Sequence, residues 1–181
     1  MSKLILIVAS FFLVNSILAQ NVYTYSVTSI EGDNKPLSAC QGKKILIVTL
    51  PVQQTSANDS LLHSLDSIRA AYADSVVIIA TPSYEDGYTP ALKNDLKLWY
   101  RSILGNAIIV TEGIYTRKTS GSQQHPLFKW LTDKTMNGHF NQDVSGPRNK
   151  FFVWKDGELV GVLSAQTKPG SPVMNELLQG E

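Results

Sequence analysis

The chain of 181 residues contains a single cysteine, Cys40, and it has almost no net charge. Because one thiol cannot close an internal disulfide, the fold must be held by packing. The 16 basic and 15 acidic residues form no basic cluster. The sequence therefore lacks the electrostatic basis for binding nucleic acid or an anionic membrane, and neither is an expected partner.

Long apolar runs are also scarce, and the only one covers residues 4–18. It is short for a membrane-spanning helix. Lys3 precedes this run, and the small residue Ala19 follows it before the polar Gln20. A positive start, an apolar run and a small residue are typical of a secretory signal. We expect cleavage after Ala19 or Gln20 and export to the periplasm, the cell envelope or the exterior; an uncleaved membrane anchor is the alternative.

Residues 21–181 show no internal repeat, low-complexity tract or linker. Removal of residues 1–20 would take away one charge, Lys3, and would leave 15 basic against 15 acidic residues. Apolar residues make up 43% of the chain and charged residues 17%, which is typical of a globular protein. The sequence therefore predicts one domain over residues 21–181, with no stable membrane insertion once the signal is removed.

Strand patterns and helix patterns alternate along this domain. Residues 45–50 and 76–80 are continuous apolar runs, typical of strands that are buried on both faces. Between them, apolar residues at helical spacing predict a helix whose N-cap is Asn58, Asp59 or Ser60. The same patterns predict strands at 22–27, 107–110, 151–154 and 159–163, and helices starting at Thr89-Pro90 and covering 125–131 and 172–179.

The order of these elements predicts an α/β fold. A helix between the two buried strands favours parallel pairing, because parallel strands need a crossover. The turn at residues 155–157 favours an antiparallel hairpin near the C-terminus. This order is typical of a thioredoxin-like three-layer α/β/α sandwich with a central mixed sheet.

Five short phrases resemble the glutathione peroxidase family, in the same order and over the expected elements. They are a Gly-Lys before the first buried strand, a proline after the second, a His-Pro-Leu helix start, a Lys-Phe-Phe-Val strand and an Asp-Gly turn. They occupy residues 42–48, 80–82, 125–131, 150–153 and 156–157. The resemblance runs from about Tyr25 to Leu178 and implies the glutathione peroxidase-type version of the thioredoxin-like fold.

The resemblance also implies a peroxide-reducing cysteine or selenocysteine after the first buried strand, with a glutamine, a tryptophan and an asparagine completing the site. The corresponding positions in this chain are Gln54, Glu85, Gly146 and Pro147, and all four differ from the family residues. A carboxamide cannot replace a thiolate, because it offers no accessible anion. A charged glutamate nearby would oppose thiolate formation. The ordinary peroxidase reaction is therefore expected to be lost.

Two interpretations of the function follow. In the first, the protein is a non-catalytic module that binds an unknown protein or small molecule in the former active-site crevice. In the alternative, it is an atypical thiol-dependent peroxidase or oxidoreductase, active in oxidative stress, that uses Cys40 and an external thiol reductant. Cys40 lies well upstream of Gln54. A small buried residue beside a strand is the simpler interpretation of that cysteine.

The three histidines and the serines give no specific indication of a metal site or of a hydrolase site. We expect His63 to be exposed and His125 to help start its helix. No pair of histidines has the spacing to a carboxylate or thiol that a metal site needs, so neither a metal nor a cofactor is expected. Ser56, His139 and Asp143 can be written as a hydrolase trio, but a serine-rich chain offers such trios by chance.

Residues 84–86 and Tyr88 follow the second buried strand, where an α/β sheet presents its binding crevice. They are interpreted either as ligand contacts or as a solvated acidic loop. Trp99 and Trp130 fall on apolar helical faces and are expected in the core. The side to which Trp154 points stays open, because strand alternation alone does not decide it.

Overall fold

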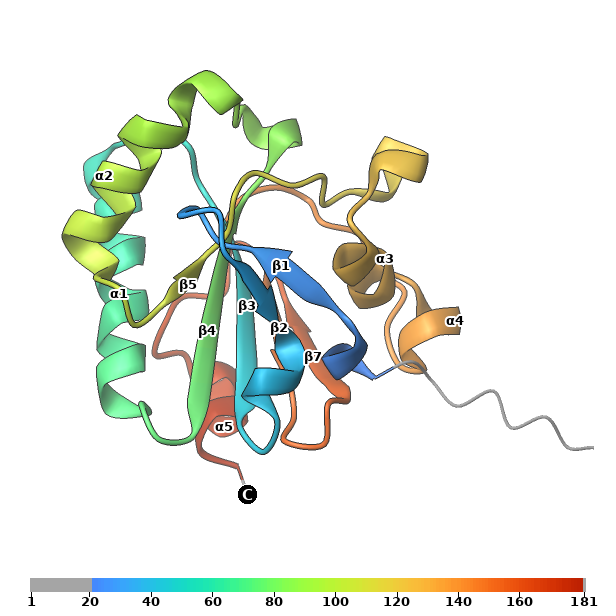
Figure 1. Cartoon of the computed structure of the whole chain (residues 1–181). Coiled ribbons are helices and arrows are strands. Elements are labelled where there is room, and N and C mark those ends of the chain that lie inside the picture. The colour runs from blue at the N-terminus through green and yellow to red at the C-terminus, as the bar shows by residue number, and fades with distance from the viewer. Residues whose placement is uncertain (1–20, 181) are drawn as a thin grey trace, which may run out of the picture.

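A computed structural model of the protein describes residues 21–180 (Figure 1). The expected signal peptide, residues 1–20, lies outside this range. Within residues 21–180, no helix has the length and apolar character that are needed to cross a membrane.

Five strands form the central sheet in the order β5-β4-β3-β6-β7. β3 (Lys44–Leu50), β4 (Val76–Pro82) and β5 (Ile109–Val110) are parallel. β6 (Lys150–Val153) pairs antiparallel with β3, and β7 (Leu159–Leu163) pairs antiparallel with β6. The sheet is therefore mixed, as the sequence predicts, and its parallel part is joined by helical crossovers.

Helices cover both faces of this sheet (Figure 1). α1 (Ser56–Ala71) and α2 (Lys93–Leu104) lie together on one face, and α5 (Pro172–Gln179) packs into the same core. α3 (Pro126–Thr132) and the short α4 (Lys134–Asn137) lie on the opposite face. This arrangement confirms the three-layer α/β/α sandwich.

β3 divides the hydrophobic core into two clusters. Leu46, Val48 and Leu50 face the cluster that contains the apolar side chains of α1, α2 and α5. Ile45 and Ile47 face the cluster that contains α3. All seven residues of β3 are buried, which explains why this strand appears in the sequence as a continuous apolar run.

The prediction of a strand over residues 22–27 is wrong in part. Val22–Thr24 forms a 3-10 turn, because the side chain of Asn21 accepts a backbone N–H and caps it. The strand β1 covers only Ser26–Thr28, and it pairs antiparallel with β2 (Asn34–Pro36). Both strands lie in a two-stranded sheet outside the central one.

The N-cap of α1 is Thr55, and not one of the three predicted residues. Its Oγ1 accepts the backbone N–H of Asn58 at 3.3 Å. The predicted caps, Asn58, Asp59 and Ser60, all lie inside the helix that starts at Ser56. The helix begins more than one turn before Leu61, its first buried apolar residue. The apolar pattern therefore does not locate the cap, which is set by the polar side chain that accepts a free N–H of the first turn.

The remaining elements differ from expectation mainly at their ends. A 3-10 turn, Pro90–Leu92, precedes α2, so the α-helix starts later than Thr89-Pro90. The expected role of His125 is confirmed, since its Nδ1 accepts the backbone N–H of Leu127 at 3.3 Å at the start of α3. The sequence analysis missed α4, which is a single turn and too short to show a periodic pattern.

Candidate functional site

Three loops meet at one edge of the central sheet (Figure 1). Loop 51–55 follows β3, the turn Tyr84–Asp86 follows β4, and loop 146–149 precedes β6. They share this edge because β4 is parallel to β3 and β6 is antiparallel to it. The structure therefore brings to one edge the loops that carry the four predicted site positions, Gln54, Glu85, Gly146 and Pro147.

Thr49, near the end of β3, holds loop 146–149 in place. Its buried Oγ1 donates to the carbonyl of Gly146 at 2.9 Å and accepts the N–H of Asn149 at 2.9 Å. The carbonyl of Thr49 accepts the N–H of Arg148 at 2.7 Å. Arg148 has a φ of 73°, which is uncommon for a residue other than glycine, so these bonds hold a costly backbone conformation.

A hollow of about 260 Å³ lies between the three loops. Its lining consists of two prolines, one valine and three polar residues: Pro51, Pro147, Val52, Gln53, Asn58 and Asp86. Gln54 is exposed and does not line the hollow, and neither does Glu85. Of the four predicted site positions, only Pro147 lines the hollow, and Gln53 and Asn58 line it without having been predicted as site residues.

Asp86 is the charged group in the wall of this hollow. Its side chain is only 7% exposed, and it forms an ion pair with Arg117. Its Oδ2 is buried and has no hydrogen-bond partner among the described residues. Burial raises the pKa of Asp86; Arg117 opposes this effect and Glu85 adds to it. The Oδ2 is thus enclosed in the wall beside the Arg117 side chain, whose Nε is likewise buried and without a hydrogen-bond partner among the described residues.

Glu85 joins the turn after β4 to residues 116–120. Its Oε1 accepts the backbone N–H of Arg117 at 2.8 Å and the hydroxyl of Ser120 at 2.6 Å. The N–H of Thr116, at 2.9 Å, and the hydroxyl of Ser83 also donate to this carboxylate. Burial alone would raise the pKa of Glu85, but the hydrogen bonds lower it to about 2. The carboxylate is therefore charged at neutral pH and fully occupied within the protein.

The structure does not bring Cys40 to this edge. Cys40 ends a 3-10 turn, Leu37–Cys40, that precedes the first residue of β3, whereas loop 51–55 follows the last. A strand of this length spans roughly 20 Å, at about 3.3 Å per residue. The Cys40 side chain packs in the α3 cluster and is 5% exposed. Burial raises the pKa of its thiol, although Lys43 opposes the rise.

The trio of Ser56, His139 and Asp143 is not assembled. Ser56 starts α1 at the edge that carries the hollow. The His139 imidazole pairs instead with Glu158, at 3.6 Å, beside the β6–β7 turn at the opposite edge of the sheet. Asp143 accepts the backbone N–H of Lys118 at 3.0 Å. Within residues 21–180, no group of three His, Cys, Asp or Glu side chains is placed to hold a metal ion.

The aromatic residues after β4 pack against other side chains of the protein. Tyr88 is 3% exposed and belongs to the core, and its ring lies so close to Gly113 that a Cβ there would come within 1.9 Å. The ring of Tyr84 stacks on that of Tyr115 at 4.7 Å. Of the residues expected in this loop as ligand contacts, only Asp86 lines the hollow.

The three tryptophans and His63 all lie outside the lining of the hollow. Trp99 and Trp130 are buried in the core, and His63 is exposed, as expected. Trp154, whose side was left open, is half-buried, and the ammonium of Lys44 lies 4.2 Å from its ring centre. None of these residues contacts the hollow.

Arg148 connects the hollow to the start of α1. Its Nη2 donates to the side-chain oxygen of Asn58 at 2.7 Å and to the carbonyl of Ala57 at 3.3 Å. Arg148 was not predicted as a site residue, because no sequence motif around it indicates a contact with a helix ninety positions away. Only the pairing of β3 with β6 brings the two together.

Comparison with known proteins agrees with this architecture. No family model matches the chain. Glutathione peroxidase 1 of Caenorhabditis elegans is 25% identical over 151 residues, which cover 82% of this chain and 90% of that protein. The homologues found among curated proteins are glutathione peroxidases.

Solved structures show the same fold. A structure described as Trgpx in apo form has a TM-score of 0.65 at 20% identity, covering 89% of this chain and 97% of that one. The exposed lipoprotein thioredoxin Etrx1 of Streptococcus pneumoniae has a TM-score of 0.53 at 19% identity, covering 84% of this chain and 96% of that one. The chain therefore has the thioredoxin-like fold of the glutathione peroxidases.

The carboxylate of Glu85 makes a testable contribution to stability. The pKa of Glu85 is lowered from 4.5 to about 2 in the folded state, so its contribution is complete above about pH 4.5 and is lost as the pH falls toward 2. Glu85→Gln should destabilise the protein at pH 7 by roughly 1–3 kcal/mol, nearer the lower value because the side chain is half-buried. Urea unfolding at pH 7 and pH 3 measures both effects.

The matched control is Glu176→Gln, at an exposed position on α5. At each pH, the urea midpoint of this variant should be nearly the same as that of the native protein. The Glu85→Gln variant should also lose less stability than the native protein between pH 7 and pH 3. If both variants behaved alike, the bonding network around Glu85 would not have the role described.

Proposed function

We propose that the protein is an exported binding module that uses the hollow between loop 51–55, the turn Tyr84–Asp86 and loop 146–149, and that it does not reduce peroxides. The observation that carries this proposal is the absence of sulfur from this edge. The lining of the hollow contains no cysteine, and the single cysteine lies beyond the other end of β3. The relationship to glutathione peroxidases supports a shared scaffold, and the chemistry needs a separate argument.

Peroxide reduction needs a thiolate that attacks the O–O bond. The position expected to carry it is occupied by Gln54, whose amide has no accessible anion. The nearby carboxylates of Glu85 and Asp86 would also disfavour a thiolate at this edge, since like charges raise the pKa of an acid. The buried thiol of Cys40 has a raised pKa and lies far from these groups. The native arrangement therefore favours binding over redox chemistry.

The carboxylate of Asp86, the charged group in the lining, defines the ligand chemistry that we propose for the hollow. Its buried Oδ2 has no partner among the described residues, which is unfavourable by about 1–3 kcal/mol, and a ligand N–H would remove that cost once the Arg117 side chain moves aside. Asn58 and Gln53 add amide groups to the same lining. The hollow thus suits a group that carries several N–H donors, such as a guanidinium or an ammonium group on a protein or a small molecule.

The absence of peroxidase chemistry is tested with hydrogen peroxide and cumene hydroperoxide, using glutathione or thioredoxin as the reductant. The native protein and Cys40→Ser should both show no turnover above background. Gln54→Cys serves as a matched control, because it places a thiol in the exposed loop. In the folded protein that new thiol should react with a disulfide reagent, while Cys40 should react only after unfolding. Turnover that disappears in Cys40→Ser would overturn the proposal and establish Cys40 as the reactive thiol.

The hollow itself is tested by NMR titration with methylguanidinium chloride. The backbone signals of Val52, Gln53 and Gly87 should shift, because these residues line or adjoin the hollow. Tetramethylammonium chloride is the matched control, since it has the same charge but no N–H donor. Asp86→Asn should abolish the shifts, whereas Asp33→Asn at an exposed distant site should preserve them. Equal shifts with both cations would contradict hydrogen bonding at Asp86.

Export is supported by the signal pattern in residues 1–20 and by the way the domain begins. The side chain of Asn21 caps the first turn and donates to the carbonyl of Asp156, and the N–H of Val22 donates to Gly157. Asn21 and Val22, which directly follow residues 1–20, are therefore bonded to the β6–β7 turn. Expression of the full chain in a secreting host, followed by intact mass measurement, should give a product that starts at Gln20 or Asn21. A cell-retained product that keeps residues 1–20 would contradict export.

A further inference from the structure

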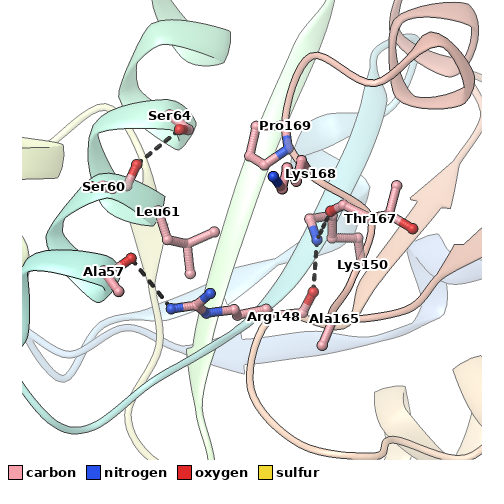
Figure 2. Close-up of a pocket in the computed structure, with 10 residues that line it drawn as sticks. All are labelled: Ala57, Ser60, Leu61, Ser64, Arg148, Lys150, Ala165, Thr167, Lys168 and Pro169. Atoms are coloured by element: carbon pink, nitrogen blue, oxygen red, sulfur yellow. Dashed lines mark hydrogen bonds between the residues drawn. The ribbon is translucent and has the colours of Figure 1, made fainter.

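A second pocket lies on the other side of Arg148 from the hollow. It has a volume of about 280 Å³ and is bounded by α1, by the start of β6 and by the segment between β7 and α5 (Figure 2). Its lining comprises Ala57, Ser60, Leu61, Ser64, Arg148, Lys150, Ala165, Thr167, Lys168 and Pro169. The volume is close to the lower end of the range for small-molecule sites, about 300 Å³.

The charges in this pocket all have one sign. Arg148, Lys150 and Lys168 are basic, and the lining contains no acidic residue. None of the three forms an ion pair with any residue in the described range 21–180. The chain as a whole is almost neutral, so three unpaired cations around one small cavity are a local concentration of charge.

Lys150 is the most informative of these residues, because it is only 1% exposed. Its ammonium donates to the carbonyls of Arg148, at 2.8 Å, and Thr167, at 2.9 Å. An ammonium has three donors, and the described residues provide no partner for the third. Burial and the charge of Arg148 lower the pKa of Lys150 to about 8. A buried cation without a counter-ion is costly, and an anion in the adjoining pocket would offset that cost.

Arg148 is held rigidly at the mouth of this pocket. Its Nη2 is bound to Ala57 and Asn58 on the first turn of α1, and Figure 2 shows the side chain lying across the gap toward that helix. Its Nη1 and Nε have no partner among the described residues, so these donors remain for a ligand. The hydroxyl of Thr167 adds a group that can rotate toward an oxyanion, whereas the hydroxyls of Ser60 and Ser64 donate to the carbonyls of Ser56 and Ser60 within α1.

We propose that this pocket binds a small molecule that carries two negative charges on oxyanion groups, which Arg148, Lys150 and Lys168 neutralise together. A phosphate monoester and a compact dicarboxylate share this chemistry. Arginine offers a planar fork of donors and lysine a compact charge, and both are common ligands of such oxyanions. The first turn of α1 contributes the positive end of its helix dipole. The pocket is separate from the hollow at Asp86, so this proposal does not depend on peroxidase activity or on its absence.

The probes are inorganic phosphate and succinate, each compared with potassium chloride at equal ionic strength and pH 7. Isothermal titration calorimetry should show saturable binding of at least one of the two dianions to the native protein, and thermal unfolding should shift upward with the same ligand. The comparison of the two probes distinguishes phosphate compounds from dicarboxylates. Stabilisation by both dianions that is no larger than stabilisation by chloride would overturn the proposal.

Two variants test the residues. Lys168→Met changes an exposed position and should weaken binding roughly tenfold, which corresponds to one charge-assisted hydrogen bond. Lys150→Met should weaken it at least as much, and circular dichroism verifies that the variant is folded. Lys155→Met, at the exposed β6–β7 turn on the far edge, is the matched control and should bind as the native protein does. If Lys155→Met weakened binding as much as Lys168→Met, the effect would reflect net charge and the pocket would be excluded.

Discussion

β3 pairs with a strand on each side, and these two pairings position the loops and pockets of the molecule. Val48 lies opposite Ala80 of β4 in a parallel pair and opposite Lys150 of β6 in an antiparallel pair. This double pairing gathers three loops at one edge of the sheet. Thr49 then extends the strand by bonding to both ends of loop 146–149. The hollow and the basic pocket both lie beside residues that this strand places.

The scaffold and the chemistry of this protein are separable, because different groups maintain them. The two apolar clusters on either side of the sheet stabilise the fold, and neither requires a reactive group at the crevice. A thiolate contributes to catalysis through its charge and nucleophilicity, and the packing of the fold does not require it. In this chain, the lining of the hollow carries amides and a carboxylate.

Two polar groups at this edge show opposite uses of a buried charge. The carboxylate of Glu85 accepts hydrogen bonds from Ser83, Ser120 and residues 116–117. These bonds join two loops and use its hydrogen-bonding capacity within the protein. Lys150 has carbonyl partners but no counter-ion among the described residues, so its charge remains available to the adjoining pocket. The difference between them is whether the protein itself completes the set of hydrogen bonds.

Sequence alone predicts the three-layer fold, the buried strands and the absence of a cysteine from loop 51–55. These features depend on periodicity, composition and residue identity, and they are local properties of the chain. The packing of the chain places Cys40 before the start of β3, and it gives both oxygens of Glu85 a hydrogen bond while Oδ2 of Asp86 has none among the described residues. It also brings Arg148 to α1 and Lys150 to Thr167. Those contacts join segments far apart in sequence, and only the pairing and packing of the strands brings them within hydrogen-bonding distance.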